Sequence, residues 1–518
     1  MLKNITDKKL FFSFLLAIII LFGIFLRFYN IGVKAFDRDE FFELNSSYGY
    51  FKTGHFVAWD FNFERPFGPN MQDDSSNERA EVFRWQLAQL YHFHEPTEAL
   101  TRSLGSAWGM IGILLVYLVT VSLTGNRYIA LIAALLTAVG ESEIIYSRRL
   151  RMYAMFFPMY LAFSWMVYKF YESKYKGRFA LFKKIQEKTG FNFSYFLLML
   201  VAGLISYNVH ILTLNIAVTL LAYSLILFLL AVKKGDYINK YSITLAASVA
   251  GFLALKSPIL FDYYRSMRKN IRFFTSNYDF SKQYFSDWIY PAIGVALIVV
   301  GAWYLFQKMK LKKETLFILL SGLIPMLLAV FVWKREESHR YIYFLQSFGI
   351  ILSAAGIYGV IQLVASRIKN YNCKKIAVII LLIAFLSGVN YGYLSKKSDV
   401  YVQKSNSYYP DFETIFGYVK QHKSAEDVMI TRAYRSFYWR GAGIKTYDIK
   451  SLQMGATGCQ DKIDKIVKEN PSGWVVYPKV DKLNICGAGR DYYQNNLARI
   501  KNSQIPSSVE IYRWGNGS

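Results

Sequence analysis

Residues 10–29, LFFSFLLAIIILFGIFLRFY, are almost entirely apolar and carry a single charge, on Arg27. A helix of about 20 apolar residues is long enough to cross the hydrocarbon core of a bilayer. No small-residue cleavage site follows the apolar run, so we interpret it as a retained span and not as a removed signal peptide. Arg27, Phe28 and Tyr29 at its end are typical of an anchor at the membrane surface. This stretch therefore predicts a membrane protein.

The composition of the whole chain agrees with this prediction. The 518 residues are 53% hydrophobic, 18% aromatic and only 19% charged, and the mean hydropathy is +0.20. These values exclude a disordered or collagen-like chain, which would be more polar or richer in Gly and Pro. The three cysteines are too few for a disulfide scaffold and have no C-x-x-C spacing for zinc.

Further apolar windows of spanning length follow the first one. Together they predict a mostly α-helical, polytopic transmembrane bundle of about eleven spans. The windows are 10–29, 104–124, 127–146, 152–171, 194–212, 213–232, 243–261, 289–306, 315–333, 342–363 and 376–394.

The charges between these windows predict which way the bundle faces. Lys and Arg number 61 against 36 Asp and Glu, a formal net charge of +25. Every second short connection is rich in lysine, as cytoplasmic loops are. We therefore expect the N-terminus inside and the C-terminus outside, in a multi-pass cell-membrane protein. The excess charge then requires no nucleic-acid partner. The basic connections are 3–9, Arg127, 174–188, 233–240, 308–313 and 367–375.

Two outer stretches are too long to be simple loops. The first outer loop, 30–103, is acidic, and its segments 39–52 and 79–95 have the apolar spacing of helices that lie in the membrane interface. The second stretch alternates helix-like and strand-like segments, which predicts a small α/β domain. We thus divide the chain into a transmembrane catalytic module, 1–396, and an extracytoplasmic α/β domain, 397–518. In that domain we expect helices at 411–422, 461–469 and 490–502, and strands at 427–432, 473–477 and 508–514.

Cys459 and Cys486 both lie in this second stretch. A disulfide between them and two unpaired buried thiols are both compatible with the sequence, because sequence does not give the distance between two side chains. A disulfide would agree with an oxidising compartment outside the cytoplasm.

The first group of candidate functional residues is the stretch Phe36-Asp37-Arg38-Asp39-Glu40, just after the first span. Carboxylates at a membrane surface are costly to desolvate, and such a group acts as a general base or as a ligand of a hard cation. The structural alternative is a solvated turn in which Asp39 is the N-cap of the next helix and Glu43 lies near the capping position.

The second group lies between the third and fourth windows, in the segment 142–153. Arg148, Arg149 and Arg151 are on the predicted outer side, against the positive-inside trend. Arginine is well suited to bidentate binding of phosphate, so a lipid phosphate is one partner to expect. Pairing with the acids of the first outer loop, or contact with ordinary headgroups, is the alternative.

The third group is the segment 336–341, before the tenth window. Arg340 would face inward from a helix end beside His339, a candidate proton carrier. His210, near the end of the fifth window, is weaker, since a lone histidine there is more often structural. All three groups belong to the predicted outer side, which suits chemistry on a lipid-linked anionic substrate. A transporter more often places charges mid-membrane, where Lys256 is the main example here.

In their order along the chain these motifs resemble the GT-C glycosyltransferases, most of all the protein O-mannosyltransferase and aminoarabinose transferase-like (PMT-like) group. The resemblance covers most of the chain and is strongest over 30–171. The pair Asp39-Glu40 alone is a weak signal, but the ordered set is fairly specific. That set is Phe36–Glu40, Thr53-Gly54, Leu100–Gly105, the Ser-Arg-x-x-Arg-Met-Tyr segment within Tyr146–Tyr153, and Arg340-Tyr341.

This resemblance implies an inverting membrane glycosyltransferase. It would move a sugar from a polyprenyl-phosphate donor to a protein, lipid or glycan acceptor outside the cytoplasm. Asp39 matches the family's essential carboxylate and would be the base, with Glu40 positioning it or helping to hold the donor. The donor-phosphate region would contain Arg148, Arg151, Tyr153, His339 and Arg340, with Arg102 and His210 as secondary residues.

The chain also departs from the family pattern. The additional acid Asp37 leaves open whether Asp37 or Asp39 is the base, and the proline-rich acceptor region is matched only at Arg65-Pro66. A divalent cation, Mg²⁺ or Mn²⁺, stays open as a cofactor, and Asp39, Glu143 and His210 would be its ligands. Two further functions compete with the transferase: a flippase of lipid-linked glycans and a non-catalytic membrane scaffold.

Overall fold

We describe the protein from a computed structural model. The structure describes residues 2–67, 80–255, 276–334, 338–452, 458–503 and 505–515, together with residues 261, 265, 268, 271, 272 and 274. Its contacts group the chain into two compact units, which are treated separately below. The helical unit comprises Met1–Phe28, Ser76–Val82 and Gly105–Gly392, and the mixed unit comprises Tyr29–Ser75, Phe83–Leu104 and Tyr393–Ser518.

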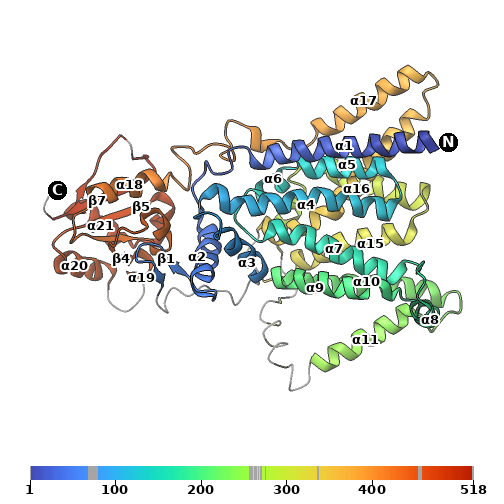
Figure 1. Cartoon of the computed structure of the whole chain (residues 1–518), viewed down its shortest axis with the longest axis horizontal. Helices are drawn as coiled ribbons and strands as arrows, with labels where there is room; N and C mark the ends of the chain where they lie inside the picture. The colour runs from blue at the N-terminus through green and yellow to red at the C-terminus, as the bar shows by residue number, and fades with distance from the viewer. Residues whose placement is uncertain are drawn as a thin grey trace. The chain divides into compact units, whose positions relative to one another are not determined.

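Long apolar helices make up the helical unit, and most of them run roughly parallel to one another (Figure 1). They form because their residues are apolar over many successive turns, and a helix satisfies every backbone polar group within the segment. The helices are α1 (Leu2–Phe28), α4 (Glu98–Thr124), α5 (Arg127–Val139), α6 (Glu141–Ser147), α7 (Tyr153–Glu172), α8 (Ala180–Thr189), α9 (Phe196–Val209), α10 (Asn215–Val232), α11 (Lys240–Leu255), α13 (Asp279–Tyr284), α14 (Pro291–Trp303), α15 (Lys312–Phe331), α16 (Gln346–Ala365) and α17 (Tyr371–Ser387).

The predicted class, a mostly helical polytopic bundle with a small α/β domain, is confirmed, whereas the number of spans stays a prediction. Every one of the predicted windows contains a helix. Among the described residues, six helices are long and apolar enough to cross a membrane, or up to eight if two bent pairs are each one span. The shortfall arises partly because α11 has 16 residues and α17 has 17, both below the 18 that a span requires.

Close backbone approach joins α14 and α16. A Cβ atom on Gly301 would lie 1.9 Å from the carbonyl oxygen of Leu352, and one on Gly356 would lie 2.2 Å from that of Leu297. Glycine at both positions therefore allows the two helix backbones to touch, which is how small residues stabilise helix pairs in membranes. We expect larger side chains at either position to separate the pair.

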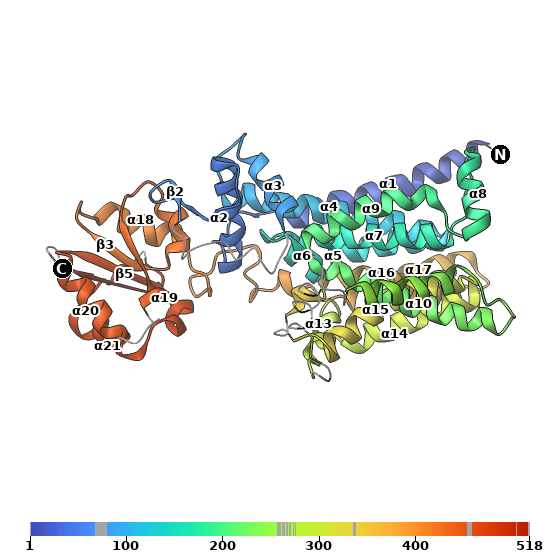
Figure 2. The same cartoon turned by 90° about the horizontal axis from the view of Figure 1, so that it is seen from below.

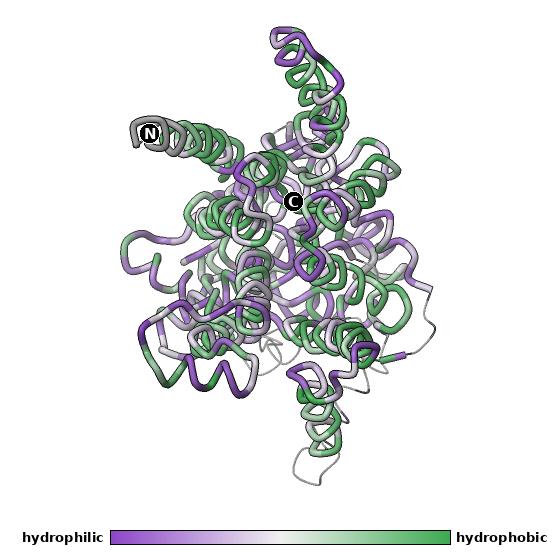
Figure 3. The backbone as a smooth tube through the Cα atoms, turned by 90° about the vertical axis from the view of Figure 1, so that its right-hand side faces the viewer, coloured by the Kyte–Doolittle hydropathy of each residue, from purple (hydrophilic) through white to green (hydrophobic). Residues whose placement is uncertain are grey.

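One end of the helical unit collects the lysine-rich connections. Glu172, at the end of α7, accepts a 2.7 Å bond from Lys313 at the start of α15 and a 3.2 Å bond from Lys240 at the start of α11. The N-terminus lies at this end (Figure 2), and Figure 3 faces it, with hydrophobic helices joined by hydrophilic connections. This grouping agrees with the predicted alternation of basic loops, and the cytoplasmic location of this end remains a proposal.

A five-stranded sheet forms the core of the mixed unit. Its order is β4-β3-β5-β7-β6, in which β3 pairs in parallel with β4 and β5, while β7 pairs antiparallel with β5 and β6. The strands are β3 (Val428–Thr431), β4 (Lys445–Asp448), β5 (Gly473–Pro478), β6 (Ala498–Arg499) and β7 (Val509–Trp514). The helices around them are α18 (Phe412–His422), α19 (Ile449–Leu452), α20 (Cys459–Glu469) and α21 (Gly487–Asn496), with 3₁₀ segments η8 (Ala433–Trp439) and η9 (Lys479–Asn484).

Most of the elements expected in residues 397–518 are present. The expected helix at 490–502 is wrong in its second half, because α21 ends at Asn496 and residues 498–499 pair with β7. β4 and η8 were not expected. Cys459 and Cys486 form a disulfide that joins the starts of α20 and α21, so the two-thiol alternative is wrong. The remaining cysteine, Cys373, is exposed and unpaired.

The first outer loop packs against η8 within the mixed unit. It contributes α2 (Arg38–Thr53), the short antiparallel pair β1 (Trp59–Asp60) and β2 (Arg65–Pro66), and most of α3 (Glu81–Leu90). The ring of Phe41 on α2 lies 5.2 Å from that of Tyr434, and the ring of Phe36 lies 5.6 Å from that of Phe437. The apolar face of α2 is therefore buried by protein within this unit.

Candidate functional site

The acidic turn at residues 37–40 begins α2 through a reciprocal capping box. Asp37 Oδ1 accepts a 2.9 Å hydrogen bond from the backbone N–H of Glu40, and Glu40 Oε2 accepts one of 2.9 Å from that of Asp37. This pattern satisfies two backbone donors that a helix start leaves unpaired. The predicted N-cap, Asp39, is wrong by two positions, because Asp37 occupies that place. Asp39 lies in the first turn of α2, half-buried, and takes no part in the capping box.

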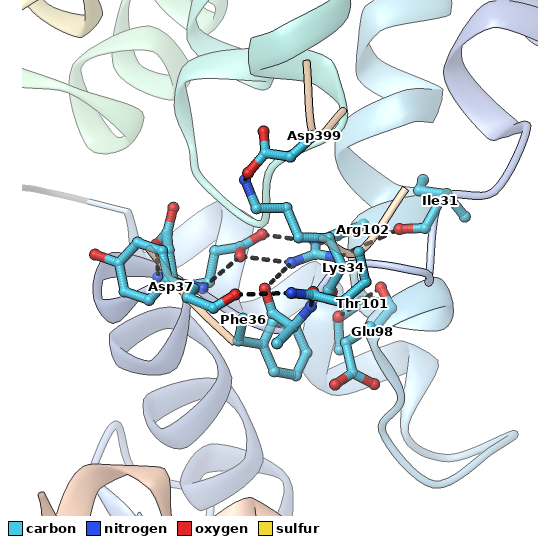
Figure 4. A network of polar contacts seen from close by, with 12 residues as sticks. Ile31, Lys34, Phe36, Asp37, Glu98, Thr101, Arg102 and Asp399 are labelled. Carbon is cyan, nitrogen blue, oxygen red and sulfur yellow. Dashed lines mark hydrogen bonds and ion pairs between the residues drawn. The ribbon is translucent and has the colours of Figure 1, made fainter. Parts of the chain in front are cut away.

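Glu40 is also bound by Arg102, from the first turns of α4. Arg102 Nε donates to Glu40 Oε1 at 2.8 Å and Nη2 donates to Oε2 at 2.7 Å, and both side chains are buried (Figure 4). The same guanidinium donates to three backbone carbonyls ahead of α2, those of Ile31, Lys34 and Ala35. Such bidentate bonds are strong and fix geometry. Arg102 and Glu40 thus position the loop and the turn that contain Asp39.

Two more side chains, those of Arg84 and Tyr438, hold the same region. Glu43, predicted to lie near the cap, instead accepts a 2.7 Å bond from Arg84 Nε on α3. Tyr438 Oη accepts from the backbone N–H of Phe36 at 2.9 Å and donates to Glu98 Oε1 at 2.8 Å. Burial, followed by the nearby Glu98 carboxylate, raises the pKa of the Tyr438 phenol well above its usual value, so the phenol remains a donor. α2 is therefore anchored by α3, α4 and η8 together.

In the helical unit, two arginines cap helix ends reciprocally. Arg27, in the last turn of α1, donates to the carbonyls of Thr137 at 2.8 Å and Ala138 at 3.0 Å, where α5 ends in a 57° bend before α6. Arg148, directly after α6, donates through Nη1 to the carbonyls of Arg27 at 2.9 Å and Leu26 at 3.4 Å. Final helix carbonyls need such donors when they are buried. The expectation that Arg27 is a surface anchor is wrong, since its side chain is fully buried.

The predicted second and third groups meet in an aromatic cluster. The ring of Tyr146 on α6 lies 4.5 Å from that of Tyr343, 5.4 Å from that of His339 and 6.1 Å from that of Tyr153. The ring of His210 lies 5.7 Å from that of Tyr153. Segments that are far apart in sequence thus form one aromatic cluster.

Arginines border this cluster. The guanidinium of Arg151, which is buried, lies 5.5 Å from the centre of the Tyr153 ring. That of Arg340 lies 5.0 Å from the centre of the Tyr341 ring, and its Nη2 donates to Tyr341 Oη at 3.2 Å. A guanidinium group is planar, is permanently charged and stacks on aromatic rings, and these two lie beside the same aromatic cluster. The neighbouring residues 335–337, which include Glu336 and Glu337 of the predicted third group, lie outside the described residues, as does Lys256.

The two histidines lie in different surroundings. Burial lowers the pKa of His339 to about 4, and its Nε2 lies 3.3 Å from Gln346 Nε2. A neutral imidazole at this place is a poor fit to the proton carrier expected from sequence. His210 is fully buried, and its Nδ1 accepts a 3.1 Å bond from the backbone N–H of Leu212. His210 therefore caps the 3₁₀ segment Ile211–Leu214, which is the structural alternative for a lone histidine.

Sequence reasoning missed a buried pair of carboxyl groups in the helical unit. Glu143 on α6 and Asp287, between α13 and α14, interact with each other and line a small cavity of about 20 Å³ together with Tyr284 and Gln346. Asp287 Oδ1 accepts a 2.7 Å bond from the backbone N–H of Ser142. Glu143 was considered only as a metal ligand. No periodic signal links residues 143 and 287, so their pairing was beyond the sequence.

Among the residues that the structure describes, no three His, Cys, Asp or Glu side chains converge in a way that could hold an ion. The proposed ligand set of Asp39, Glu143 and His210 also loses His210 Nδ1 to its backbone bond. We derive no step through a metal.

Comparison with solved structures finds proteins that share this fold. The chain is similar to the oligosaccharyltransferase AglB of Archaeoglobus fulgidus, in complex with an inhibitory peptide and a dolichol-phosphate, with a TM-score of 0.62 and 12% identity over 92% of this chain and 70% of that one. It is also similar to apo ArnT of Cupriavidus metallidurans, with a TM-score of 0.59 and 10% identity over 98% of both chains.

A second structure of the Cupriavidus metallidurans ArnT, bound to undecaprenyl phosphate, gives a TM-score of 0.55 at 11% identity, with 98% of both chains covered. The sequence matches no protein-family model and no curated protein. At these identities the similarity establishes the fold alone, and this is the fold that the resemblance of the motif order implied.

Proposed function

We propose that the chain is a membrane glycosyltransferase that takes its sugar from a polyprenyl-phosphate-linked donor. The acceptor would be a protein, a lipid or a glycan outside the cytoplasm. The two solved structures bound to dolichol-phosphate and undecaprenyl phosphate support this donor class, because they share the fold over most of the chain. The Cys459–Cys486 disulfide supports an exterior location for the α/β elements.

The single observation that carries the proposal is that the carboxylates of residues 37–40 have different roles. Asp37 caps α2, and Glu40 is held by Arg102 and by the Asp37 backbone N–H. Asp39 lies in the first turn of α2, half-buried, on a turn that these bonds hold in place. A general base has to be held in position, and a carboxylate that already caps a helix is less suited to that role. This arrangement favours Asp39 over Asp37 as the base.

The reaction we infer is an inverting displacement at the anomeric carbon. Asp39 removes the proton from the acceptor hydroxyl, and the oxygen of that hydroxyl forms the new bond to the anomeric carbon. The bond from carbon to phosphate oxygen breaks on the opposite face, and polyprenyl phosphate leaves with the electron pair. Arg151 and Arg340 would stabilise the charge that develops on the phosphate. Tyr153 would orient the Arg151 guanidinium, and His339 would be a neutral ring of the aromatic cluster.

Arg148 has a narrower part in this proposal than the motif order implied. Its Nη1 is committed to the carbonyls at the end of α1. We therefore assign Arg148 mainly to the positioning of the segment that contains Arg151. Arg102 has the same kind of role for the acidic turn.

Mass spectrometry of lipids that co-purify with the full-length protein tests the donor class. We expect a polyprenyl phosphate or its glycosylated form in the wild type, and on the order of 10-fold less in Arg340→Gln, because one charge-assisted contact to phosphate is lost. Substitution of Lys282, an exposed lysine in an i,i+3 pair with Asp279, is the matched charge control. Equal lipid retention in Arg340→Gln and Lys282→Gln would contradict the proposal. Movement of a lipid-linked glycan across vesicles without sugar release would favour the flippase instead.

A further inference from the structure

The end of α7 and the connection to α9 form a pocket at the lysine-rich end of the helical unit. It has a volume of about 510 Å³ and is lined by Lys169, Lys174, Lys176, Tyr175, Asn192 and Ser194, among others. Residues 174–188 were expected from sequence only as a basic loop. The structure instead folds them into a segment that closes on the end of α7 and then into helix α8 (Figure 2).

Polar bonds fix the walls of this pocket. Gln186 on α8 accepts a 2.7 Å bond from the backbone N–H of Tyr175 and donates one of 2.9 Å to the carbonyl of Ser173. Asn192 donates to Ser173 Oγ at 2.8 Å, and its backbone N–H donates to the carbonyl of Phe170 at 2.8 Å. The segment that contains Lys174 and Lys176 is thus held in place from α8 and from the start of α9.

Three lysines, Lys169, Lys174 and Lys176, line the pocket. Lys169 and Lys176 are near enough to repel one another, while Glu314 is the carboxylate that acts on Lys169. Within the described part of the chain, neither Lys169 nor Lys174 nor Lys176 forms an ion pair. Asn192, Ser194 and Tyr195 complete the lining, and Ser194 Oγ donates to Asn192 Oδ1 at 2.6 Å. Three amines on one pocket match the charge of a phosphate group.

Helix α8 adds an apolar surface directly beside this charge. Its axis is bent by 112° from that of the following Phe193–Val209 segment, and it has four charged residues among its 10, so it is unsuited to spanning. None of its residues is buried, and Leu181 and the preceding Phe179 are 66% and 74% exposed. A basic helix that lies across the end of a spanning helix, with exposed apolar side chains, is typical of an element at the headgroup level of a bilayer.

We propose that this pocket binds the phosphate of an anionic phospholipid headgroup, with Phe179 and Leu181 against the acyl chains. Basic pockets between spanning helices on the cytoplasmic side are suited to such headgroups, and the inner leaflet contains most of the anionic lipid. The bound lipid fixes α7, α8 and α9 at the membrane surface. The inference is independent of the transferase reaction, because it depends only on the residues of this connection.

Reconstitution in nanodiscs tests the inference with purified full-length protein. Nanodiscs contain either phosphatidylcholine alone or phosphatidylcholine with phosphatidylglycerol, and native mass spectrometry after detergent release counts the anionic lipids retained. We expect the wild type to retain phosphatidylglycerol and Lys174→Gln/Lys176→Gln to retain on the order of 10-fold less, since each lysine near an anionic surface contributes about 1 kcal/mol. The matched control is Lys183→Gln/Lys184→Gln, two exposed lysines on α8 that do not line the pocket.

Three results would overturn the inference. One is equal loss of phosphatidylglycerol in both double variants, which would indicate a diffuse charge effect. Another is the absence of any preference for phosphatidylglycerol in the wild type. The third is displacement of the retained lipid by millimolar inorganic phosphate, which would identify a free phosphate ion as the ligand. Retention that resists inorganic phosphate and fails only in the pocket variant supports a lipid headgroup site.

Discussion

Arg102 binds both carboxylate oxygens of Glu40, at 2.8 Å and 2.7 Å, and neither side chain is more than 4% exposed. The pair joins the start of α4 to the start of α2 within the mixed unit. Since Glu40 also closes the capping box with Asp37, one buried ion pair determines where the first turn of α2 lies. The proposed base, Asp39, is a residue of that turn.

Loss of Arg102 should destabilise the mixed unit strongly. Arg102→Met leaves the buried carboxylate of Glu40 without its partner, and breaking a buried pair in this way costs about 3–5 kcal/mol. Thermal or denaturant unfolding of the purified protein measures the effect. The double variant Arg102→Met/Glu40→Gln should be much less destabilised than the sum of the two single variants. Additive losses would mean that the two side chains do not act as a pair.

Substitutions at residue 37 should show that its role is to cap α2 and not to act as the base. Asp37→Ala removes the side-chain acceptor for the Glu40 N–H and should cost about 1 kcal/mol of stability, whereas Asp37→Ser retains a capping oxygen and should cost little. Unfolding midpoints of the two variants measure this difference. A large loss in Asp37→Ser, equal to that in Asp37→Ala, would show that the charge at residue 37 matters for more than the cap.

His339 should make stability depend on pH in a defined window. Burial lowers its pKa to about 4 in the folded protein, against about 6.5 when unfolded, so the unfolded chain binds the proton first as the pH falls. The stability present above pH 6.5 is then lost progressively toward pH 4, by about 3 kcal/mol. His339→Gln should lack this component, and the difference between unfolding curves of wild type and variant isolates it. Parallel curves from pH 7 to pH 4 would contradict the buried neutral state.

The disulfide should stabilise the α/β elements of the mixed unit. Cys459 and Cys486 are 27 residues apart, and a cross-link of that length contributes about 2–4 kcal/mol, mainly by restricting the unfolded chain. Cys459→Ser/Cys486→Ser should lower the unfolding midpoint, and a reducing agent should lower that of the wild type but not that of the variant. Cys373→Ser, which alters the exposed free thiol, is the matched control.

The long apolar helices and most of the α/β elements could be predicted because their signals are local. Apolar windows dictate helices in lipid, and the run of aromatic and β-branched residues within Gly473–Tyr477 indicates a buried strand. β4 was missed because Lys445–Asp448 is polar and lies at the sheet edge, where burial imposes no alternation. The N-cap was misplaced because Asp37 and Asp39 are equally good caps by residue type, and only the position of Glu40 as the third helical residue decides between them.

The polar contacts of the candidate site were largely beyond the sequence. Arg102 and Glu40 are separated by 62 residues, and Arg27 finds its acceptors at Thr137 and Ala138 only because α5 ends there in a bend. An arginine in the last turn of an apolar window can anchor at the surface or cap a neighbouring helix, and sequence alone does not distinguish these. We expected an anionic partner for Arg148, which stays a prediction, whereas the bond to the backbone carbonyl at the end of α1 was not expected.

The most direct test of the central claim is the release of polyprenyl phosphate from a polyprenyl-phosphate-linked sugar by full-length protein in liposomes. The assay compares wild type, Asp39→Asn and Asp37→Ser, with folding checked by unfolding midpoint. General-base catalysis contributes about 10²–10⁴-fold, so we predict that Asp39→Asn loses at least about 100-fold in turnover while it remains folded, and that Asp37→Ser retains most of the turnover. Undiminished turnover by Asp39→Asn would contradict the account.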